Sequence, residues 1–341
     1  MIEVARHRGD AAEWDVFVRA QANWTHFHLY GWKTAIERAF GHECIYLAAR
    51  DNGTLVGVLP LVRVKSLLFG HYLVSMPFVN YGGPLGTGAA IEALSTAATE
   101  LAARDRVRLL ELRSRYPLPL SLDVSHRKVT VIRELPAGGS SVLWKQLDAK
   151  LRSQIRRPQK EGVVVRFGLD QIEPFFSVFS RHMRDLGTPT QPLAFFRILG
   201  EIFGDEFWCG CAYLDGQAIA GGCGFRWRDE FEITWASALN EHKRIAPNMF
   251  LYWSFLERAA DEGLGFFNFG RCTPGGGTHR FKLQWGSREE QLFWYQRRSS
   301  STAVGTPSPN DAQLAWGPRL WKHLPERVAT ALGPRIVRYI P

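Results

Sequence analysis

Residues 45–59 read IYLAARDNGTLVGVL, so that Asn52-Gly53 separates two apolar runs. An Asn-Gly pair between such runs is the strongest short-range signal for a β-hairpin. Residues 211–222 read CAYLDGQAIAGG and place Asp215-Gly216 in the same setting. The two turns begin 163 residues apart, at positions 52 and 215. The chain therefore contains two predicted hairpins about half its length apart.

A second pair of landmarks follows the hairpins at nearly the same offset. A helix-like stretch at 90–104 leads into the apolar residues 109–113, and a similar stretch at 249–262 leads into 266–269. The two apolar stretches begin 157 residues apart. Two landmarks that repeat with similar spacing indicate an internal repeat. We predict an α/β protein with mixed sheets, in which one fold occurs twice.

The repeat suggests boundaries along the chain. We predict a first domain at 1–141, a second at 142–298, a linker rich in Ser, Thr, Pro and Gly at 299–310, and a basic, Trp-containing tail at 311–341. Hydrophobic spacing predicts helices within 1–40, at 172–186 and at 193–203. Strands are predicted at 44–80, 163–167 and 207–234, and a strand at 129–135 closes the first half.

Composition limits the class of protein. The hydrophobic share is 45% and the charged share 22%, values that are ordinary for a soluble globular protein. The net charge of +9 favours an anionic partner or substrate, such as nucleic acid, a phosphorylated metabolite, a CoA-type donor or an anionic lipid surface.

The cysteines and the N-terminus indicate the compartment. The five cysteines are scattered without a Cys-x-x-Cys pair, which argues against a metal site and suits a reducing cytoplasm. Charged residues precede any apolar block at the N-terminus, so no signal peptide is expected. We expect a cytoplasmic protein, either free or peripheral on the inner face of the cytoplasmic membrane.

Two segments concentrate positive charge. Residues 150–160 read KLRSQIRRPQK and contain no acidic residue, so Arg152 and Arg156 are candidates to bind substrate phosphates, or else belong to a solvated helix face. In the tail, Trp316, Leu320 and Trp321 begin an apolar pattern with basic residues around it. A basic helix with Trp on its apolar face can lie on an anionic membrane. The alternative is that the tail packs back onto the body of the protein.

The order of the predicted elements resembles the GNAT (acyl-CoA N-acyltransferase) fold. In that fold a loop of pattern [Arg/Gln]-x-x-Gly-x-[Gly/Ala] presents backbone N–H groups to the CoA pyrophosphate at a helix N-terminus. The matching residues 244–249 read RIAPNM, and both glycine positions are occupied, by Pro247 and Met249. Residues 82–86 of the first half are rich in glycine but lack the leading Arg or Gln. A short-chain acyl-CoA donor is therefore disfavoured.

A more specific resemblance lies in the second half. The matching residues are Ala246-Pro247-Asn248, Trp253, Ala259, Gly263, Asn268-Phe269-Gly270-Arg271, Gly277-Thr278, Phe281-Lys282 and Trp285-Gly286. Together with Tyr81-Gly82-Gly83-Pro84 and the basic 151–157 stretch, they resemble the FemAB family. More narrowly, they resemble the FemAB-like proteins that accompany exosortase/PEP-CTERM and exopolysaccharide systems.

This resemblance implies two tandem GNAT-like domains and transfer of an acyl or aminoacyl group to an amine. Lys282 is similar to the family lysine that stabilises the oxyanion or the terminal phosphate of the donor, and a fixed cation facing developing charge can contribute several kcal/mol. Phe281 is placed to stack on a base of the donor, which contributes about 1–3 kcal/mol. The alternative for this pair is an ordinary strand start.

Four further residues are candidates for substrate binding, and three of them have a structural alternative. Arg271 would clamp a phosphate or carboxylate, or form a salt bridge with Glu232 or Glu111. Tyr81 would hydrogen-bond the acceptor, or pack in a turn.

Lys33 sits near the position where family members hold a precursor phosphate. His279 would accept a proton near neutral pH, or serve as a loop residue.

These observations predict an N-acyl or aminoacyl transferase that acts on an amine of a cell-envelope or exopolysaccharide precursor. The amine would attack the activated donor directly, without a tightly bound cofactor, and the donor would be an aminoacyl-tRNA, an acyl carrier protein or an acyl-CoA. The alternative is a non-catalytic GNAT pseudoenzyme that binds nucleic acid or a membrane-associated assembly complex.

Overall fold

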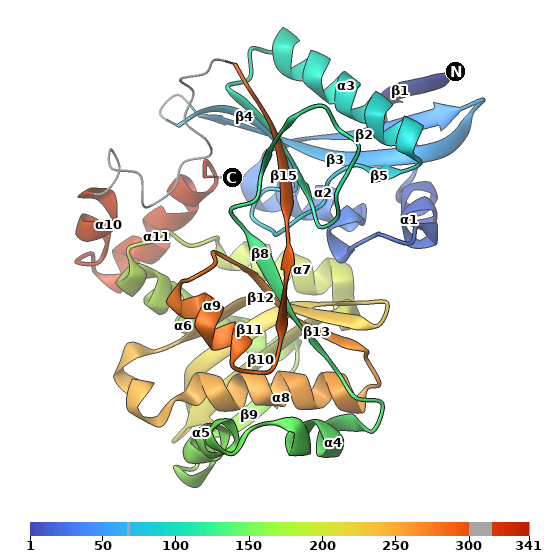
Figure 1. Cartoon of the computed structure of the whole chain (residues 1–341). Coiled ribbons are helices and arrows are strands. Elements are labelled where there is room, and N and C mark those ends of the chain that lie inside the picture. Colours follow the sequence, from blue (N-terminus) through green and yellow to red (C-terminus); the bar gives the residue numbers. More distant parts are fainter. Residues whose placement is uncertain (67–68, 300–315, 341) are drawn as a thin grey trace. The chain divides into compact units, whose positions relative to one another are not determined.

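The chain forms two compact units (Figure 1). The computed structural model describes residues 1–66, 69–299 and 316–340. Within these residues, unit 1 comprises 1–128, the described part of 291–311, and 335–340; unit 2 comprises 129–290 and the described part of 312–334. Each unit has its own mixed sheet, so the expected fold class is confirmed.

Unit 1 is an α/β layer built on a sheet of order β1-β2-β3-β4-β6-β15-β7, with β5 paired to β3. Its strands are β1 (Ile2–Arg6), β2 (Glu43–Asp51), β3 (Thr54–Ser66), β4 (Gly70–Ser75), β5 (Leu85–Gly86), β6 (Leu109–Ser114), β7 (Asp123–Ser125) and β15 (Phe293–Arg298). Its helices are α1 (Ala11–Ala20), the short η1 (His26–His28), α2 (Gly31–Phe40) and α3 (Gly88–Arg104).

Unit 2 has a sheet of order β14-β8-β13-β12-β11-β10-β9. Its strands are β8 (Val129–Glu134), β9 (Val164–Phe167), β10 (Phe207–Leu214), β11 (Gln217–Trp227), β12 (Glu230–Ala238), β13 (Phe266–Cys272) and β14 (Arg288–Gln291). Its helices are α4 (Gly139–Gln146), α5 (Ala149–Lys160), η2 (Leu169–Gln171), α6 (Ile172–Leu186), α7 (Leu193–Phe203), η3 (Gly204–Glu206), η4 (Asn240–Ile245), α8 (Pro247–Asp261) and α9 (Gly277–Leu283). The described tail contains α10 (Trp316–Trp321) and α11 (Glu326–Val337).

Both predicted hairpins are present. The pair β2–β3 closes on Asn52 (φ 48°) and Gly53 (φ 82°), and β10–β11 closes on Asp215 (φ 50°) and Gly216 (φ 78°). Two consecutive positive φ angles are what a type I′ turn requires, and its twist matches that of the strands. The local Asn-Gly and Asp-Gly signals were therefore sufficient to place these turns.

Each unit also contains a parallel strand pair joined by a helix. In unit 1, β4 pairs with β6 from Tyr72↔Leu109 to Val74↔Glu111, and α3 connects them. In unit 2, β12 pairs with β13 from Glu230↔Phe266 to Glu232↔Asn268, and α8 connects them. In both units the parallel pairing covers three residue pairs. The repeat inferred from spacing is thus a repeat of structure.

The expected domain boundary at 141/142 differs from the structural one. Strand β8 (Val129–Glu134), expected to close the first half, pairs with β13 of unit 2, whereas β15 pairs with β6 and β7 of unit 1. Each unit therefore takes one strand from the part of the chain assigned to the other. Hydrophobic pattern identifies a strand, but not its distant partner. For the same reason β1 was missed. Residues Ile2–Arg6 form an edge strand that pairs with β2, although residues 1–40 were expected to be helical.

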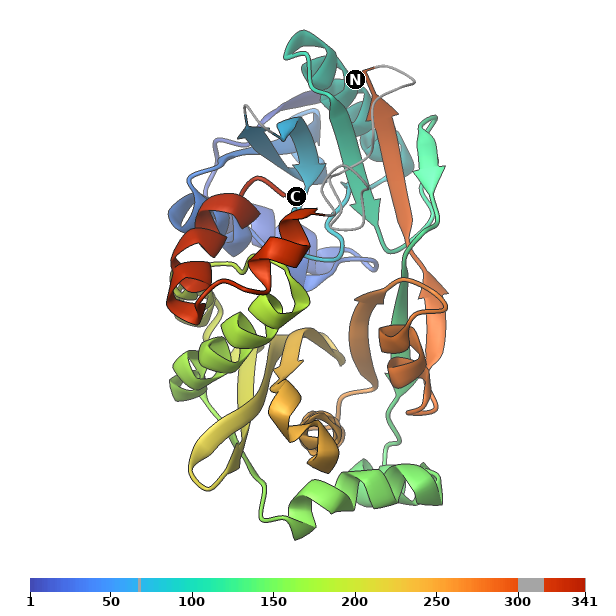
Figure 2. The same cartoon turned by 90° about the vertical axis from the view of Figure 1, so that its left-hand side faces the viewer.

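Of the described tail, residues 316–334 belong to unit 2 and residues 335–340 to unit 1 (Figure 2). Helix α10 lies against α6, and Trp321 is buried. Gly187, which ends α6, touches the backbone of Pro318 so closely that an added Cβ would lie 2.5 Å from its carbonyl oxygen. Of the predicted linker, residues 300–310 lie outside the described residues. In the described part of the chain, no helix is both long and apolar enough to cross a membrane.

Candidate functional site

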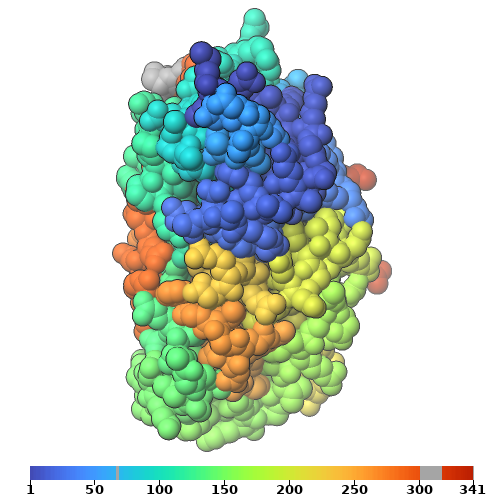
Figure 3. All heavy atoms as spheres, turned by 90° about the vertical axis from the view of Figure 1, so that its right-hand side faces the viewer, coloured from blue at the N-terminus to red at the C-terminus, as the bar shows by residue number. Residues whose placement is uncertain are grey.

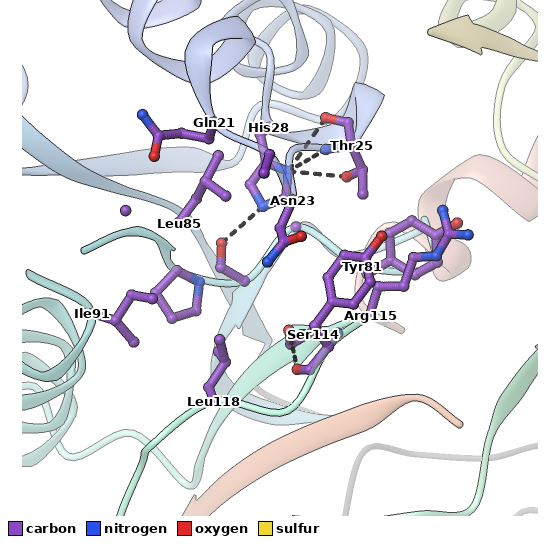
Figure 4. A pocket seen from close by; sticks show the side chains of 16 residues that line it. Gln21, Asn23, Thr25, His28, Tyr81, Leu85, Ile91, Ser114, Arg115 and Leu118 are labelled. Atoms are coloured by element: carbon purple, nitrogen blue, oxygen red, sulfur yellow. Dashed lines mark hydrogen bonds between the residues drawn. The ribbon is translucent and has the colours of Figure 1, made fainter. Parts of the chain in front are cut away.

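Unit 1 contains a cavity of about 180 Å³ between the segment after α1, the loop before α3 and the end of β6. Figure 4 shows Thr25, Tyr81 and Arg115 toward one side and the apolar Leu85 and Ile91 toward the other. A pocket with an apolar wall and a few polar groups is the usual form of a small-molecule site. The guanidinium of Arg115 gives this one a positive charge.

His28 fixes one wall of the cavity. Its Nδ1 accepts a hydrogen bond from the backbone N–H of Thr25 (3.0 Å), and its Nε2 donates to the carbonyl oxygen of Gly83 (3.0 Å). Burial lowers the pKa of His28 to about 4, more than the hydrogen bonds to backbone carbonyls raise it. The ring is therefore neutral at physiological pH, and it holds the two segments together.

Tyr81, a predicted acceptor-binding residue, lines this cavity. Its ring is fully buried, 5.4 Å from the Phe27 ring, and the Arg115 guanidinium lies 5.9 Å from its centroid. Tyr81 thus lies at a candidate small-molecule pocket. The sequence analysis missed His28 and Arg115, because neither belongs to a recognisable motif.

The glycines of the loop allow close approach of the backbone. Gly86 has φ +143°, and a Cβ there would lie 2.3 Å from the carbonyl oxygen of Val56. At Gly83 a Cβ would lie 2.8 Å from the carbonyl oxygen of Arg113. These contacts with strands account for the glycine-rich 82–86 segment without a bound phosphate.

We expect Gly86→Ala to destabilise unit 1 by about 1–3 kcal/mol, since it forces both a steric clash and an unfavourable backbone conformation. Chemical denaturation of the purified variant measures this. Gly88→Ala is the matched control, because an added Cβ at Gly88 meets nothing within 4 Å. That control should be neutral or slightly stabilising. Equal stability of the two variants would contradict the role of Gly86.

Beneath the cavity lies a buried ion pair on β6. Arg113 Nε donates to Glu111 Oε1 (2.8 Å), and the two side chains are 2% and 0% exposed. Glu111 Oε2 also accepts from Gln296 Nε2 (2.6 Å), and the guanidinium lies 4.4 Å from the Trp294 ring centroid. Residues i and i+2 of a strand share a face, which explains the pairing. Glu111 therefore pairs with Arg113. The sequence analysis had considered only Arg271 as a partner for Glu111.

In unit 2 the candidate catalytic residue Lys282 lies on α9. Its Nζ donates to the carbonyl oxygens of Gly270 (2.7 Å) and Arg271 (3.0 Å), and the side chain is buried. Burial, the largest effect, lowers the pKa of Lys282 to about 8; nearby Cys272 and Glu232 raise it, and Arg271 lowers it. The alternative of a strand start at Phe281-Lys282 does not hold, because both residues lie on the short helix α9, from which Lys282 reaches the end of β13.

Asn268 lies at the last residue pair of the parallel pairing between β12 and β13, and its side chain forms several hydrogen bonds there. Its Nδ2 donates to Glu230 Oε1 (2.8 Å) and Glu232 Oε2 (3.2 Å). Its Oδ1 accepts from Thr130 Oγ1 (2.6 Å) and from the backbone N–H of Gly270 (2.8 Å). The amide thus uses both ends to brace a bulge in β13, where register with β8 shifts between Asn268 and Arg271. That bulge presents the two carbonyls that hold Lys282.

Phe281 belongs to an aromatic cluster. Its ring lies 4.9 Å from Tyr252 and 6.3 Å from Trp285, and it is partly buried against the core. Packing therefore occupies at least one side of the ring.

His279 and Arg271 lie in the same region of unit 2. His279 Nδ1 accepts from the N–H of Gly275 (3.1 Å), and its Nε2 lies 2.7 Å from Glu289 Oε2. The imidazole therefore ties the loop before α9 to β14. Arg271 is half-buried at the end of β13, and its own carbonyl accepts from Lys282. The structure brings together Arg271, His279, Phe281 and Lys282 around α9.

Arg152 and Arg156 lie elsewhere in unit 2, on α5 (Figure 3 shows α4 and α5 in green). Arg152 Nη1 donates to the carbonyl oxygen of Leu147 (2.7 Å), just after α4, so this side chain caps a helix end. Arg156 lies over the ring of Trp144 at 5.2 Å. Arg156 remains exposed, together with Lys150, Arg157 and Lys160. Helix α5 therefore presents an exposed basic surface, but the Arg152 side chain is engaged at the end of α4.

Lys33 lies on α2 of unit 1 and is not among the residues that line the cavity. Its Nζ donates to Glu37 Oε2 at 2.9 Å, one turn along the helix. Burial is the largest single effect and lowers the pKa of Lys33, but the hydrogen bond and charge of Glu37, with smaller contributions from Tyr30 and Cys44, together raise it by more, so the pKa lies above its usual value. Lys33 is thus a charged group in an ion pair.

The loop before α8 corresponds to the predicted CoA-binding position. Ala246 adopts φ +53°, and Pro247 occupies the first position of the helix, where it has no N–H to donate. His242, Lys243 and Arg244 lie in the preceding η4. The helix N-terminus therefore keeps a basic neighbourhood, but lacks one backbone donor of the usual phosphate loop.

Comparison with known protein families gives one match, and it lies within unit 2. A family model described as an acetyltransferase (GNAT) domain matches residues 145–283. No curated protein sequence matches the chain significantly.

Among solved structures, FemX is similar over 85% of this chain and 97% of its own, at 13% identity and a TM-score of 0.63. The L-PGS structure from Bacillus licheniformis is similar over 92% and 98%, at 11% identity and a TM-score of 0.58. A tandem GNAT protein from the clavulanic acid biosynthesis pathway is similar over 89% and 100%, at 12% identity and a TM-score of 0.53. At these identities the likeness concerns the fold. This chain carries the mixed α/β GNAT fold in two tandem copies.

Proposed function

We propose that the protein is an N-acyl or aminoacyl transferase that acts on an amine of a cell-envelope or exopolysaccharide precursor. The observation that carries this proposal is the buried ammonium of Lys282. Two of its three N–H groups are held by the carbonyls of Gly270 and Arg271. In this proposal the third N–H donates to a carbonyl oxygen of the donor.

The chemistry follows from this placement. A neutral amine attacks the carbonyl carbon of the donor, a C–N bond forms, and negative charge develops on the carbonyl oxygen. Collapse breaks the bond to the leaving group, which takes up the proton that the amine loses. A cation fixed in a dry site stabilises the developing charge without reorganisation. Orientation of the two substrates supplies the rest, so no covalent enzyme intermediate is required.

Three donors fit this scheme: an aminoacyl-tRNA, an acyl carrier protein and a long-chain acyl-CoA. The exposed basic residues of α5 suit any of these anionic molecules. Pro247 at the start of α8 argues against a short-chain acyl-CoA. The residues that resemble the FemAB family, and the similarity of fold to FemX and to L-PGS, support an envelope precursor as acceptor. The narrower likeness to FemAB-like proteins of PEP-CTERM and exopolysaccharide systems favours a glycan precursor.

We propose, separately from Lys282, that the cavity of unit 1 binds a small part of a substrate. Arg115 supplies a charge for a phosphate or carboxylate, and Tyr81 and Asn23 supply hydrogen-bonding groups. The volume of about 180 Å³ suits one sugar ring or a short peptide segment rather than a whole precursor.

Mass spectrometry of molecules that co-purify with the protein tests the donor. We expect an aminoacyl, phosphopantetheine or CoA species, and transfer of its acyl group to an amine when an amino-sugar nucleotide is added. Binding of the donor without transfer to any amine tested would instead support the pseudoenzyme alternative. The modified loop before α8 is the observation that favours that alternative.

A further inference from the structure

Helix α11 buries Ala329, Gly333 and Val337, and it exposes two larger aliphatic residues. Ala329 and Gly333, one turn apart, are buried, and a Cβ at Gly333 would lie 3.0 Å from the backbone nitrogen of Thr190. On the outer side, Val328 is 40% exposed and Leu332 is 39% exposed. A helix that packs only on its own protein places its larger apolar side chains inward. In α11 only Val337 among the aliphatic residues at 328, 332 and 337 follows this rule, and the other two stay exposed.

Helix α10 shows the same feature. Trp321 is buried against unit 2, so it is not available as an outward anchor. The preceding Leu320 is 61% exposed. Isolated apolar residues on a surface are common, but here three exposed aliphatic side chains fall within thirteen residues of the sequence, on two successive short helices.

The charged residues of the tail itself are almost all basic. Arg319, Lys322 and Arg327 are exposed, and Glu326 is the one acidic residue in the sequence 316–340. Arg338 is engaged internally, since its guanidinium donates to the carbonyl oxygen of Phe40 and its own carbonyl oxygen lies 2.6 Å from His42 Nε2. The outward charge therefore comes from the residues that flank the exposed aliphatic side chains.

We infer that the tail surface, defined as Leu320, Val328 and Leu332 with Arg319, Lys322 and Arg327, docks on an anionic phospholipid bilayer. Aliphatic side chains enter the boundary between headgroups and acyl chains, while the basic side chains pair with lipid phosphates. The contact is peripheral. It does not depend on the proposed transfer reaction, and it would place a transferase beside lipid-linked precursors.

Co-sedimentation of the full chain with vesicles tests this inference. We expect the protein to bind vesicles of phosphatidylcholine mixed with phosphatidylglycerol, and not vesicles of phosphatidylcholine alone. Each Lys or Arg near an anionic surface contributes roughly a fivefold change in affinity, so Arg319→Gln/Lys322→Gln/Arg327→Gln should weaken binding about a hundredfold. Added salt should weaken binding of the unmodified chain as well.

The aliphatic side chains of the tail surface are tested by a second variant with a matched control. Leu320→Gln/Val328→Gln/Leu332→Gln should abolish sedimentation at an unchanged melting temperature, because all three side chains are exposed. Val124→Gln/Val164→Gln changes aliphatic residues of similar exposure on β7 and β9, and should leave binding unchanged.

Three results would overturn the inference. The first is equal binding to both kinds of vesicle, and the second is retained binding by the apolar variant. The third is absence of vesicle binding together with a dimer that the apolar variant converts to a monomer in sedimentation velocity. That last result would assign the tail surface to a second copy of the chain.

Discussion

Lys282→Met is expected to reduce kcat for acyl transfer by about a hundredfold to a thousandfold, with a small change in KM. Removal of one preorganised donor to an oxyanion has an effect of this size. The substitution keeps the length of the side chain and removes the ammonium. Steady-state kinetics with the donor identified by mass spectrometry measures it. Lys65→Met makes the same chemical change at an exposed position of unit 1 and should leave kcat unchanged.

The pH dependence separates a catalytic role from a structural one. The pKa of Lys282 is lowered to about 8, so its ammonium loses a proton as the pH rises through that value. If the ammonium stabilises the oxyanion, kcat of the unmodified protein falls above about pH 8, and the variant lacks this limb. A variant that keeps full activity, or keeps the limb, would refute the assignment.

The same pKa predicts a change in stability. Because the folded pKa lies below the usual value of 10.5, the unfolded chain retains a proton that the folded chain has released between these values. Stability should therefore rise with pH across that interval, and Lys282→Met should remove this contribution. Met also leaves two buried carbonyls without their donor, which costs about 1–3 kcal/mol, so kinetics must be normalised to folded protein.

Glu111→Ala is expected to lower the free energy of unfolding of unit 1 by about 3–5 kcal/mol. It leaves Arg113 as a buried charge without its carboxylate, and Gln296 without an acceptor. Amide hydrogen exchange along β6 reports on unit 1 separately from unit 2. Glu173→Ala is the control, since its pair with Arg197 is 48% and 59% exposed. Exposed pairs contribute at most about 1 kcal/mol.

The double variant Glu111→Leu/Arg113→Leu distinguishes the ion pair from packing. Removal of both charges avoids the unpaired charge, so it should be less destabilising than Glu111→Ala alone. If all three variants unfolded alike, the pair would contribute nothing specific.

The parts of the fold that could be predicted are those encoded locally. Asn52-Gly53 and Asp215-Gly216 fixed two hairpins, and hydrophobic spacing placed α6 and α7 at their observed bounds. Strand pairing between distant segments could not be obtained in this way. A strand at 129–134 carries no mark that its partner is β13 rather than a strand of the first half.

The candidate site was predictable only where a motif existed. Phe281-Lys282 and Asn268-Phe269-Gly270-Arg271 could be found by resemblance, and the structure groups them around α9. Arg152 was predicted to bind phosphates from the charge of its segment and from the family resemblance, whereas its geometry makes it a helix cap. His28 and Arg115 are single residues whose importance arises from the chain returning near Gly83 and Tyr81, which no local pattern reveals.

The exchange of β8 and β15 bears on how the polypeptide matures on the ribosome. Strand β6 forms early in synthesis, yet the neighbour that lies between it and β7 is Phe293–Arg298, made much later. Until then β6 presents an open edge with unpaired N–H and C=O groups, the kind of edge that recruits other chains. The amino-terminal half therefore cannot finish folding as it emerges, and an excised 1–141 fragment would lack a strand of its own sheet while carrying one that belongs to the other unit.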